Sequence, residues 1–277
     1  MNWLVYAILG AVLAGVSPVF AKSGLHKSNA YLAAALRGTF LVLGAWFMVN
    51  RTGTEMAFSG IGSNTWMYLI FSGIATGLVW ICMIRALQLG EVIKVVPVIE
   101  GSIILDMLVG VVLFHDALDW KRIALLILLS VGLLMMVIKS SGRGRKMGAW
   151  CGYAVGAAFF TMVTVVLARV GIRGVDSNFD RMIRYGIALL LVWLVVFATR
   201  GYTALRSMSF LDGIYLCISG AVMGGAWYCF SNTSVQMAEK FDLVAAVVLG
   251  CVFLRERLST RAIIGMILMM LGFCTFL

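Results

Sequence analysis

The sequence predicts an all-α polytopic membrane protein, with ten transmembrane helices arranged as two inverted five-helix repeats. Three observations lead to this prediction. First, the 277 residues are 62% hydrophobic and only 12% charged, whereas a soluble domain carries about twice that charge. Second, the apolar residues gather in ten runs. Third, the runs of the second half repeat those of the first at one constant offset.

Nine apolar runs are long enough to cross a bilayer, because a helix rises 1.5 Å per residue and needs about 20 residues to span the hydrocarbon core. They lie near residues 3–21, 31–49, 66–88, 92–114, 122–138, 148–168, 183–199, 210–231 and 262–277. A tenth run, 243–254, is shorter. The runs lack the alternation of transmembrane strands, and lipid offers no partner for unpaired backbone groups, so helices are expected.

The second half of the chain repeats the first. The segment SGIATGLVWIC (72–82) returns as SGAVMGGAWYC (219–229), with Ser, Gly, Gly, Trp and Cys at matching places. The same offset matches Trp3, Tyr6, Lys22 and Arg37 to Trp150, Tyr153, Arg169 and Arg184. Because each half has an odd number of spans, the second half enters the membrane in the opposite sense. The repeats are predicted at 1–138 and 148–277, joined by a basic linker at 139–147.

The ninth span departs from this symmetry. The spacing from Glu91 to Asp116 is 25 residues, whereas that from Glu239 to Glu256 is 17. The remaining 12-residue run covers only about 18 Å of a roughly 30 Å core. Either this helix is partly unwound or re-entrant, or a segment has been lost, and the sequence leaves these alternatives open.

Three stretches resemble the drug/metabolite transporter superfamily, specifically its ten-helix members with two EamA-type halves. They are RALQLGEVIKVVPVIEGS (85–102), LFHDALDWKR (113–122) and FLRERLSTRAIIGMILMMLGF (253–273). The resemblance implies two inverted bundles around a central cavity, alternating access, and both termini in the cytoplasm. The first span lacks the carboxylate with which small multidrug members of the superfamily exchange protons for drugs, so that mechanism is not expected.

The net charge of +10 does not indicate a nucleic-acid partner. Lys and Arg stand singly or in short clusters beside apolar spans, as membrane topology requires. The loop charges are nearly balanced and mildly favour the orientation opposite to that of the superfamily. The six cysteines lie inside apolar runs without CxxC spacing, so we expect neither disulfides nor metal ligands.

The fourth span carries the most charge. A charged side chain at the centre of a helix in the membrane costs about 2.5–3.5 kcal/mol, so each is a functional candidate. Lys94 is expected to pair with Glu91, three residues away. Pro97 removes a backbone donor and predicts a helix break. Glu100 and Ser102 follow this break and are candidates for substrate binding or proton coupling. The alternative for Glu100 is a structural ion pair.

Other polar and aromatic residues complete the predicted site. Trp80 and Trp227 are repeat mates, and with Tyr228 and Asn232 they form candidate walls for an aromatic or cationic solute. Simple core packing is the alternative for the two tryptophans. A further set of charges is expected to serve either coupling or structure: Arg37, Arg85, Lys94, Asp106 and Arg184.

No enzyme, metal or ATP-binding motif accompanies these residues, so no cofactor is expected. The sequence therefore predicts a secondary transporter in the cytoplasmic membrane that exports a small metabolite, amino-acid-like, aromatic or cationic. Protons or a counter-substrate are possible partners. The alternatives are a membrane sensor or scaffold that has lost transport and a lipid-modifying enzyme.

Overall fold

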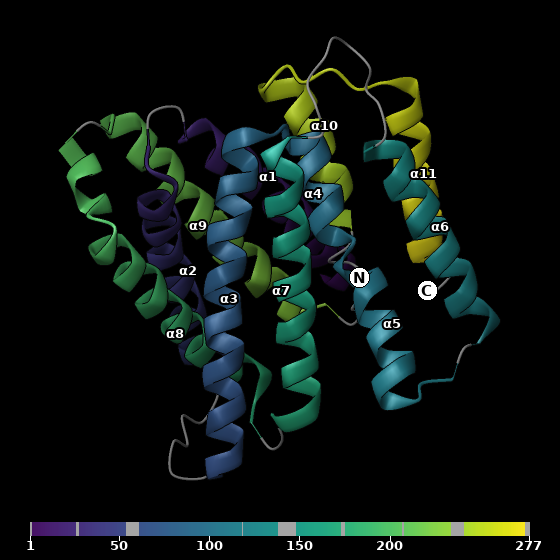
Figure 1. The fold of residues 1–277 in the computed structure, drawn as a ribbon, viewed down its shortest axis with the longest axis horizontal. Coiled ribbons are helices and arrows are strands. Elements are labelled where there is room, and N and C mark those ends of the chain that lie inside the picture. The colour runs from purple at the N-terminus through teal and green to yellow at the C-terminus, as the bar shows by residue number, and fades with distance from the viewer. Residues whose placement is uncertain are drawn as a thin grey trace.

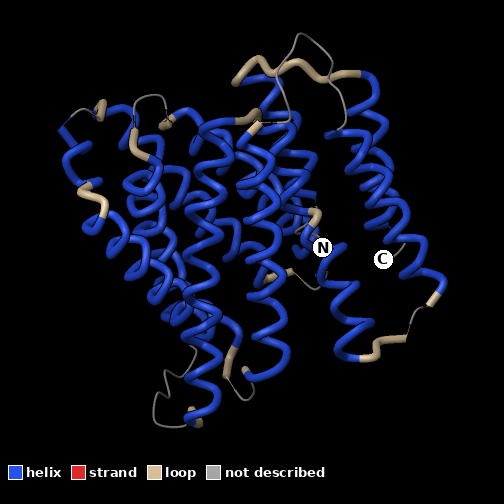
Figure 2. Tube along the Cα trace, in the orientation of Figure 1, coloured by secondary structure: helices blue, strands red, loops and turns tan. Residues whose placement is uncertain are grey.

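The computed structural model describes residues 2–25, 28–53, 61–117, 119–137, 148–172, 175–206, 208–233 and 241–274. These residues form helices and connecting loops, with no strand in the described ranges (Figure 2). The predicted linker at 139–147 and Glu239 lie outside the described residues. The elements are α1 (Asn2–Ser23), α2 (Ala30–Thr52), α3 (Ser63–Leu89), α4 (Val92–Glu100), α5 (Ser102–Phe114), α6 (Trp120–Val137), α7 (Ala149–Gly171), α8 (Ser177–Ala198), η2 (Gly201–Arg206), α9 (Phe210–Ser231), α10 (Asp242–Phe253) and α11 (Thr260–Cys274).

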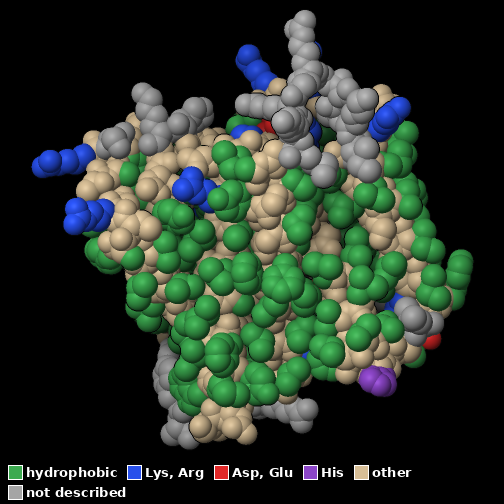
Figure 3. All heavy atoms as spheres, viewed as in Figure 1, with side chains coloured by type: hydrophobic (Ala, Val, Ile, Leu, Met, Phe, Trp, Pro, Cys, Tyr) green, Lys and Arg blue, Asp and Glu red, His purple; other side chains and the backbone are tan. Residues whose placement is uncertain are grey.

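The described helices make a multi-pass membrane protein. Eight candidate spans are long and apolar enough to cross a bilayer, with α4 and α5 counted as one, and α10 and α11 are shorter apolar helices. Large apolar side chains cover much of the outer surface, such as Leu190 at 72% and Val112 at 70% exposure. Figure 3 shows that hydrophobic side chains are spread over much of the visible face, with several basic side chains near its upper edge. This distribution suits lipid contact on the sides and water at the ends.

The fourth span is broken where the sequence predicts. α4 ends at Glu100 and α5 begins at Ser102, with Gly101 between them. Pro97 lies four residues earlier and has no N–H to donate within the helix. The Gly101 N–H donates to the carbonyl of Pro97 at 2.9 Å. The break therefore lies one turn beyond the proline.

Within the described residues, the ninth span matches the second part of the fourth. α10 is an uninterrupted helix of 12 residues, close in length to the 13-residue α5. Gly110 of α5 and Gly250 of α10 each accept the N–H of the acidic residue that follows the helix, Asp116 or Glu256. Among the described residues α10 thus corresponds to α5, and the segment just before α10, residues 234–240, lies outside the described ranges.

The two halves of the chain are interleaved rather than side by side. α1 packs on α9, α3 packs on α7 and α8, and α2 packs on α8 and α9. In Figure 1, α3 and α7 lie next to each other although they are distant in sequence. α6 packs on α11, and α4 packs on α10. All these contacts join a helix of the first half to a helix of the second.

Glycines allow the closest of these approaches, because no side chain separates the backbones. A Cβ on Gly224 of α9 would lie 3.1 Å from the Cα of Gly44 on α2. One turn earlier, a Cβ on Gly220 would collide with the carbonyl oxygen of Arg37. A Cβ on Gly73 of α3 would lie 2.6 Å from the Cβ of Ile187 and 3.2 Å from the carbonyl oxygen of Arg184, both on α8. The repeated SG…G pattern is therefore a helix-crossing motif in both halves.

Candidate functional site between the two halves

Arg37 is a buried cation held by two hydroxyl groups. Its residue exposure is 5%. Its Nε donates to Ser219 Oγ at 3.1 Å, and one terminal nitrogen donates to Ser17 Oγ at 3.2 Å. The two serines also bond to each other's backbone, because each hydroxyl donates to the carbonyl of the other residue. Arg37 thus lies where α1, α2 and α9 meet. Among the described residues, no carboxylate forms a salt bridge with it.

An aromatic series lies beside Arg37. The next residue, Gly38, has Trp80 packed so closely that an added Cβ would lie 2.6 Å from the indole ring. The ring centroid of Tyr185 is 5.4 Å from that of Trp80 and 6.4 Å from that of Trp227, both edge to face. Tyr185 therefore stands between the two predicted tryptophans. Its repeat mate is Gly38, so comparison of the halves gave no signal for this residue.

Trp227 has a polar edge and a charged neighbour. The guanidinium carbon of Arg181 lies 4.1 Å from the centroid of the Trp227 ring, within the range of a cation–π contact. The indole Nε1 is buried and has no hydrogen-bond acceptor. A buried N–H without an acceptor is destabilising. This N–H is therefore available to donate a hydrogen bond to a bound molecule.

Arg184, the repeat mate of Arg37, has a different environment. It forms an ion pair with Asp180, one turn earlier on α8, with the two atoms 2.8 Å apart. Both side chains are mostly buried, at 16% and 11% exposure. The mate of Ser219 is Ser72, and the hydroxyl of Ser72 and the Nε of Arg184 are both buried without a partner. The hydrogen bond that Arg37 makes to Ser219 therefore has no counterpart in the other half.

A buried carboxylate joins three segments at one end of the molecule. Glu256 follows α10, and its side chain is 6% exposed. It accepts the N–H groups of Val92 and Ile93, each at 3.0 Å, and it pairs with Lys22 at 2.9 Å. Lys22 also donates to the carbonyl of Gly90. The first N–H groups of α4 have no partners within the helix, and the Glu256 carboxylate accepts two of them. Its negative charge is also favourable at the N-terminus of a helix.

The opposite end carries the repeat mate of this arrangement. Asp116 follows α5 and pairs with Arg169, the mate of Lys22, at 2.9 Å. Arg122 lies 3.6 Å from the same oxygen. Figure 1 shows the α10–α11 connection at the top and the α5–α6 connection at the bottom. We call Lys22 with Glu256 the upper latch, and Arg169 with Asp116 the lower latch.

The backbone of both latches is built in the same way. The residue before each acid has a positive φ, 55° at His115 and 53° at Arg255. The N–H of Asp116 reaches the Gly110 carbonyl at 3.2 Å, and that of Glu256 reaches the Gly250 carbonyl at 3.4 Å. The left-handed residue therefore turns the chain so that the acid returns toward its own helix.

The other predicted residues of the fourth span lie on α4 and α5, and both of these helices pack on α7. Lys94 pairs with Glu91, as predicted. Glu100 is half-buried at the end of α4, and Ser102 is buried at the start of α5. Asp106 is half-buried in the second turn of α5. The aromatic series lies on α3, α8 and α9, whereas these residues lie on α4 and α5. The residues that the sequence predicted as one site therefore form two sets on different helices.

Arg85, Tyr228 and Asn232 occupy the ends of α3 and α9. Arg85 lies 5.0 Å from the ring centroid of Tyr31 and donates to Gln88. Asn232 is exposed just after α9 and donates to the carbonyl of Tyr228 at 2.8 Å. Asn232 thus binds a carbonyl in the last turn of its own helix, whereas Arg85 contacts side chains, and the site proposed below does not include these two residues.

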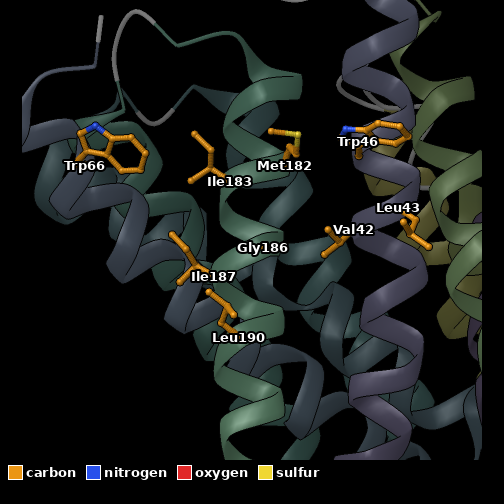
Figure 4. Close-up of a pocket in the computed structure, with 9 residues that line it drawn as sticks. All are labelled: Val42, Leu43, Trp46, Trp66, Met182, Ile183, Gly186, Ile187 and Leu190. Atoms are coloured by element: carbon orange, nitrogen blue, oxygen red, sulfur yellow. The ribbon is translucent and has the colours of Figure 1, made fainter. Parts of the chain in front are cut away.

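An apolar groove of about 620 Å³ opens on the outer surface between α2, α3 and α8. Figure 4 shows Trp46 and Trp66 at its upper rim, with Met182, Ile187 and Leu190 along α8. Its side chains are apolar, and several, such as Leu43 and Trp46, are more than half exposed. The groove suits lipid chains better than a polar solute. Among the described residues, no group of His, Cys, Asp or Glu could hold a metal ion.

Comparisons with known proteins agree with this architecture. Residues 1–138 match the EamA-like transporter family. A relative from Sinorhizobium sp, named "Uncharacterized transporter in cobO 3'region", is 31% identical over 140 residues, which are 50% of this chain and 97% of that protein. A solved structure, titled only "Crystal structure of protein", superposes with a TM-score of 0.66 at 13% identity. The superposition covers 99% of this chain and 96% of the chain in that structure, so the two proteins share a fold.

Proposed function

Because the chain belongs to the EamA-like transporter family, we propose that it is a secondary transporter that exports a small metabolite across the cytoplasmic membrane by alternating access. Two inverted five-helix repeats, residues 1–138 and 148–277, would carry out this exchange. The aligned part of the Sinorhizobium relative is about as long as one such repeat. The sequence has no ATP-binding motif, so a gradient or an exchanged solute would drive the transport.

The observation that supports this proposal is the exchange symmetry of the helix contacts between the two halves. The contact of α1 with α9 corresponds to that of α7 with α3, and both pairs are packed. Likewise, the contact of α2 with α9 corresponds to that of α8 with α3. The contact of α1 with α10 corresponds to the contacts of α7 with α4 and α5. α2 with α8, and α6 with α11, join counterparts directly. Contacts between the halves that keep this pattern when the halves are exchanged are expected of an inverted repeat.

The latches follow the same exchange and supply candidate gates. The upper latch joins Lys22 of the first half to Glu256 of the second, and the lower latch joins Asp116 of the first to Arg169 of the second. Each therefore ties the two halves together at one end. Alternating access requires one end to separate while the other closes. Ion pairs that join the halves at each end suit that role.

We place the solute between the halves, at Trp80, Tyr185 and Trp227. Ring faces and edges suit an aromatic, amino-acid-like or cationic solute. Glu100 and Ser102, beside the break after α4, are our candidates for coupling, since a carboxylate at mid-membrane can exchange a proton. Protons or a counter-substrate would then be the second partner.

Counterflow in liposomes tests the transport function. Purified protein is reconstituted into liposomes that are preloaded with unlabelled solute, and uptake of the labelled form is followed. The probes are L-phenylalanine, phenethylamine and 3-phenylpropionate, which share one ring and differ in charge. A transporter concentrates at least one label transiently above the level of protein-free liposomes. Binding of a probe without counterflow would instead indicate a sensor, and chemical conversion of a probe would indicate an enzyme.

Glu100→Gln is expected to separate coupling from movement. The amide keeps the shape of the side chain but cannot release a proton, so a pH gradient should no longer drive accumulation, whereas counterflow of the same probe should persist. Asp119→Asn, at an exposed loop position, is the control and should leave both unchanged. If the Glu100 variant keeps pH-driven accumulation, Glu100 has no coupling role.

A further inference from the structure

We propose that Arg37 binds a carboxylate of the transported solute, so that the substrate class is a small carboxylic acid with an apolar or aromatic body, such as an amino acid. This inference rests on the proposed transport function and narrows its substrate.

Arg37 carries a charge that its surroundings do not neutralise. Its contacts with Ser17 and Ser219 use two of the five N–H donors of a guanidinium. Serine hydroxyls accept hydrogen bonds, but they carry no charge. None of the ion pairs within the described ranges includes Arg37. A buried cation without an anion is strongly destabilising, so this position favours a negative ligand.

The repeat mate shows what is missing. Arg184 has Asp180 one turn earlier as a built-in anion, at 2.8 Å. The residue one turn before Arg37 is Ala33, which is fully buried and has no charge. Arg37 and Arg184 occupy equivalent places, since Gly220 and Gly73 lie against their respective carbonyl groups. Of these two arginines, Arg37 is therefore the one without a paired carboxylate among the described residues.

The groups beside Arg37 indicate the rest of the ligand. Trp80 packs against the neighbouring Gly38, and the Tyr185 ring joins Trp80 to Trp227. The buried Nε1 of Trp227 lacks an acceptor. A solute whose carboxylate meets Arg37 would place its apolar body along these rings. A second acceptor on the solute would satisfy Trp227.

The test supplies the missing anion within the protein. In Ala33→Asp, a carboxylate one turn before Arg37 reproduces the Asp180–Arg184 pair and competes with the solute. Ala33→Asn has the same shape without the charge and is the matched control. Stabilisation by 3-phenylpropionate and L-phenylalanine, measured as the shift of the unfolding midpoint in detergent, reports binding without requiring transport.

We expect both carboxylates to stabilise the wild type, and phenethylamine, which has the same ring without a carboxylate, not to do so. Ala33→Asp should weaken carboxylate binding by about tenfold or more, because the cation is already neutralised, and Ala33→Asn should bind like the wild type. Should either variant fail to fold, Arg37→Gln is expected to lose carboxylate binding and Arg37→Lys to retain part of it.

Three results would overturn the inference: no stabilisation of the wild type by either carboxylate, equal stabilisation by phenethylamine, or wild-type binding by Arg37→Gln. Different results would contradict the transport proposal. Counterflow of phenethylamine alone would retain the transporter and reject the carboxylate site. Carboxylate binding without any counterflow would retain the site and reject transport.

Discussion

Replacement of Glu256 by Gln is expected to lower the free energy of unfolding by about 3–5 kcal/mol, the usual loss when one partner of a buried ion pair is removed. The amide keeps one oxygen for the first turn of α4, but its NH₂ group would face either the N–H groups of Val92 and Ile93 or the Lys22 ammonium. Lys22 would also lose its anion. Equilibrium unfolding in detergent micelles measures the loss.

Glu91→Gln is the matched control. Glu91 also pairs with a lysine, Lys94, but its side chain is 47% exposed. Exposed pairs contribute about 0–1 kcal/mol, so this variant should unfold close to the wild-type midpoint. Equal losses from the two variants would contradict the view that Glu256 is the structural centre of the upper latch.

Gly224→Ala is expected to destabilise the protein by about 1–3 kcal/mol, the range for overpacking a filled interface. The new Cβ would lie 3.1 Å from the Cα of Gly44, and backbone on both sides leaves nothing free to rotate away. Separation of α2 from α9 would also disturb the Arg37–Ser219 contact, so transport should fall with stability. Thermal unfolding and probe binding are measured on the same sample.

The neighbouring glycine provides the comparison. A Cβ on Gly225 meets only Leu13 Cδ1, at 3.7 Å, an ordinary contact. Because alanine favours a helix over glycine by up to about 1 kcal/mol, Gly225→Ala should be neutral or stabilising. If the two alanine variants unfold at the same temperature, the close crossing of α2 and α9 does not contribute to stability.

Much of the fold could be predicted because membrane-spanning helices require a hydrophobic composition and long runs of apolar residues. The break after Pro97 and the Lys94–Glu91 pair followed from local rules about proline and helix spacing. The repeat predicted that Trp80 and Trp227 belong together, and the structure brings both against Tyr185. Repeat matching gave no signal for Tyr185 because its mate is Gly38, and a search for retained residues passes over such positions.

The candidate site depends on differences between the halves, which one sequence does not display. The position of Asp180 in the second half corresponds to Ala33 in the first half. Because of this difference, Arg37 lacks the anion that Arg184 has. The latches required knowledge of three-dimensional packing. Asp116 and Glu256 were recognised as mates, but their partners, Arg169 and Lys22, lie on helices from the other half. Asn232, predicted in the site, lies exposed at the end of α9.

Alternating access requires the two ends of the molecule to open in turn, and hydrogen exchange in nanodiscs reports the opening of each end. The wild type is compared with Glu256→Gln, which weakens the upper latch. We predict faster backbone exchange at residues 19–25 and 254–258, together with slower exchange at 110–117 and 165–172, where the lower latch is then closed for a larger fraction of the time. Faster exchange at both ends, or a change confined to the mutated end, would contradict alternating access between two inverted halves.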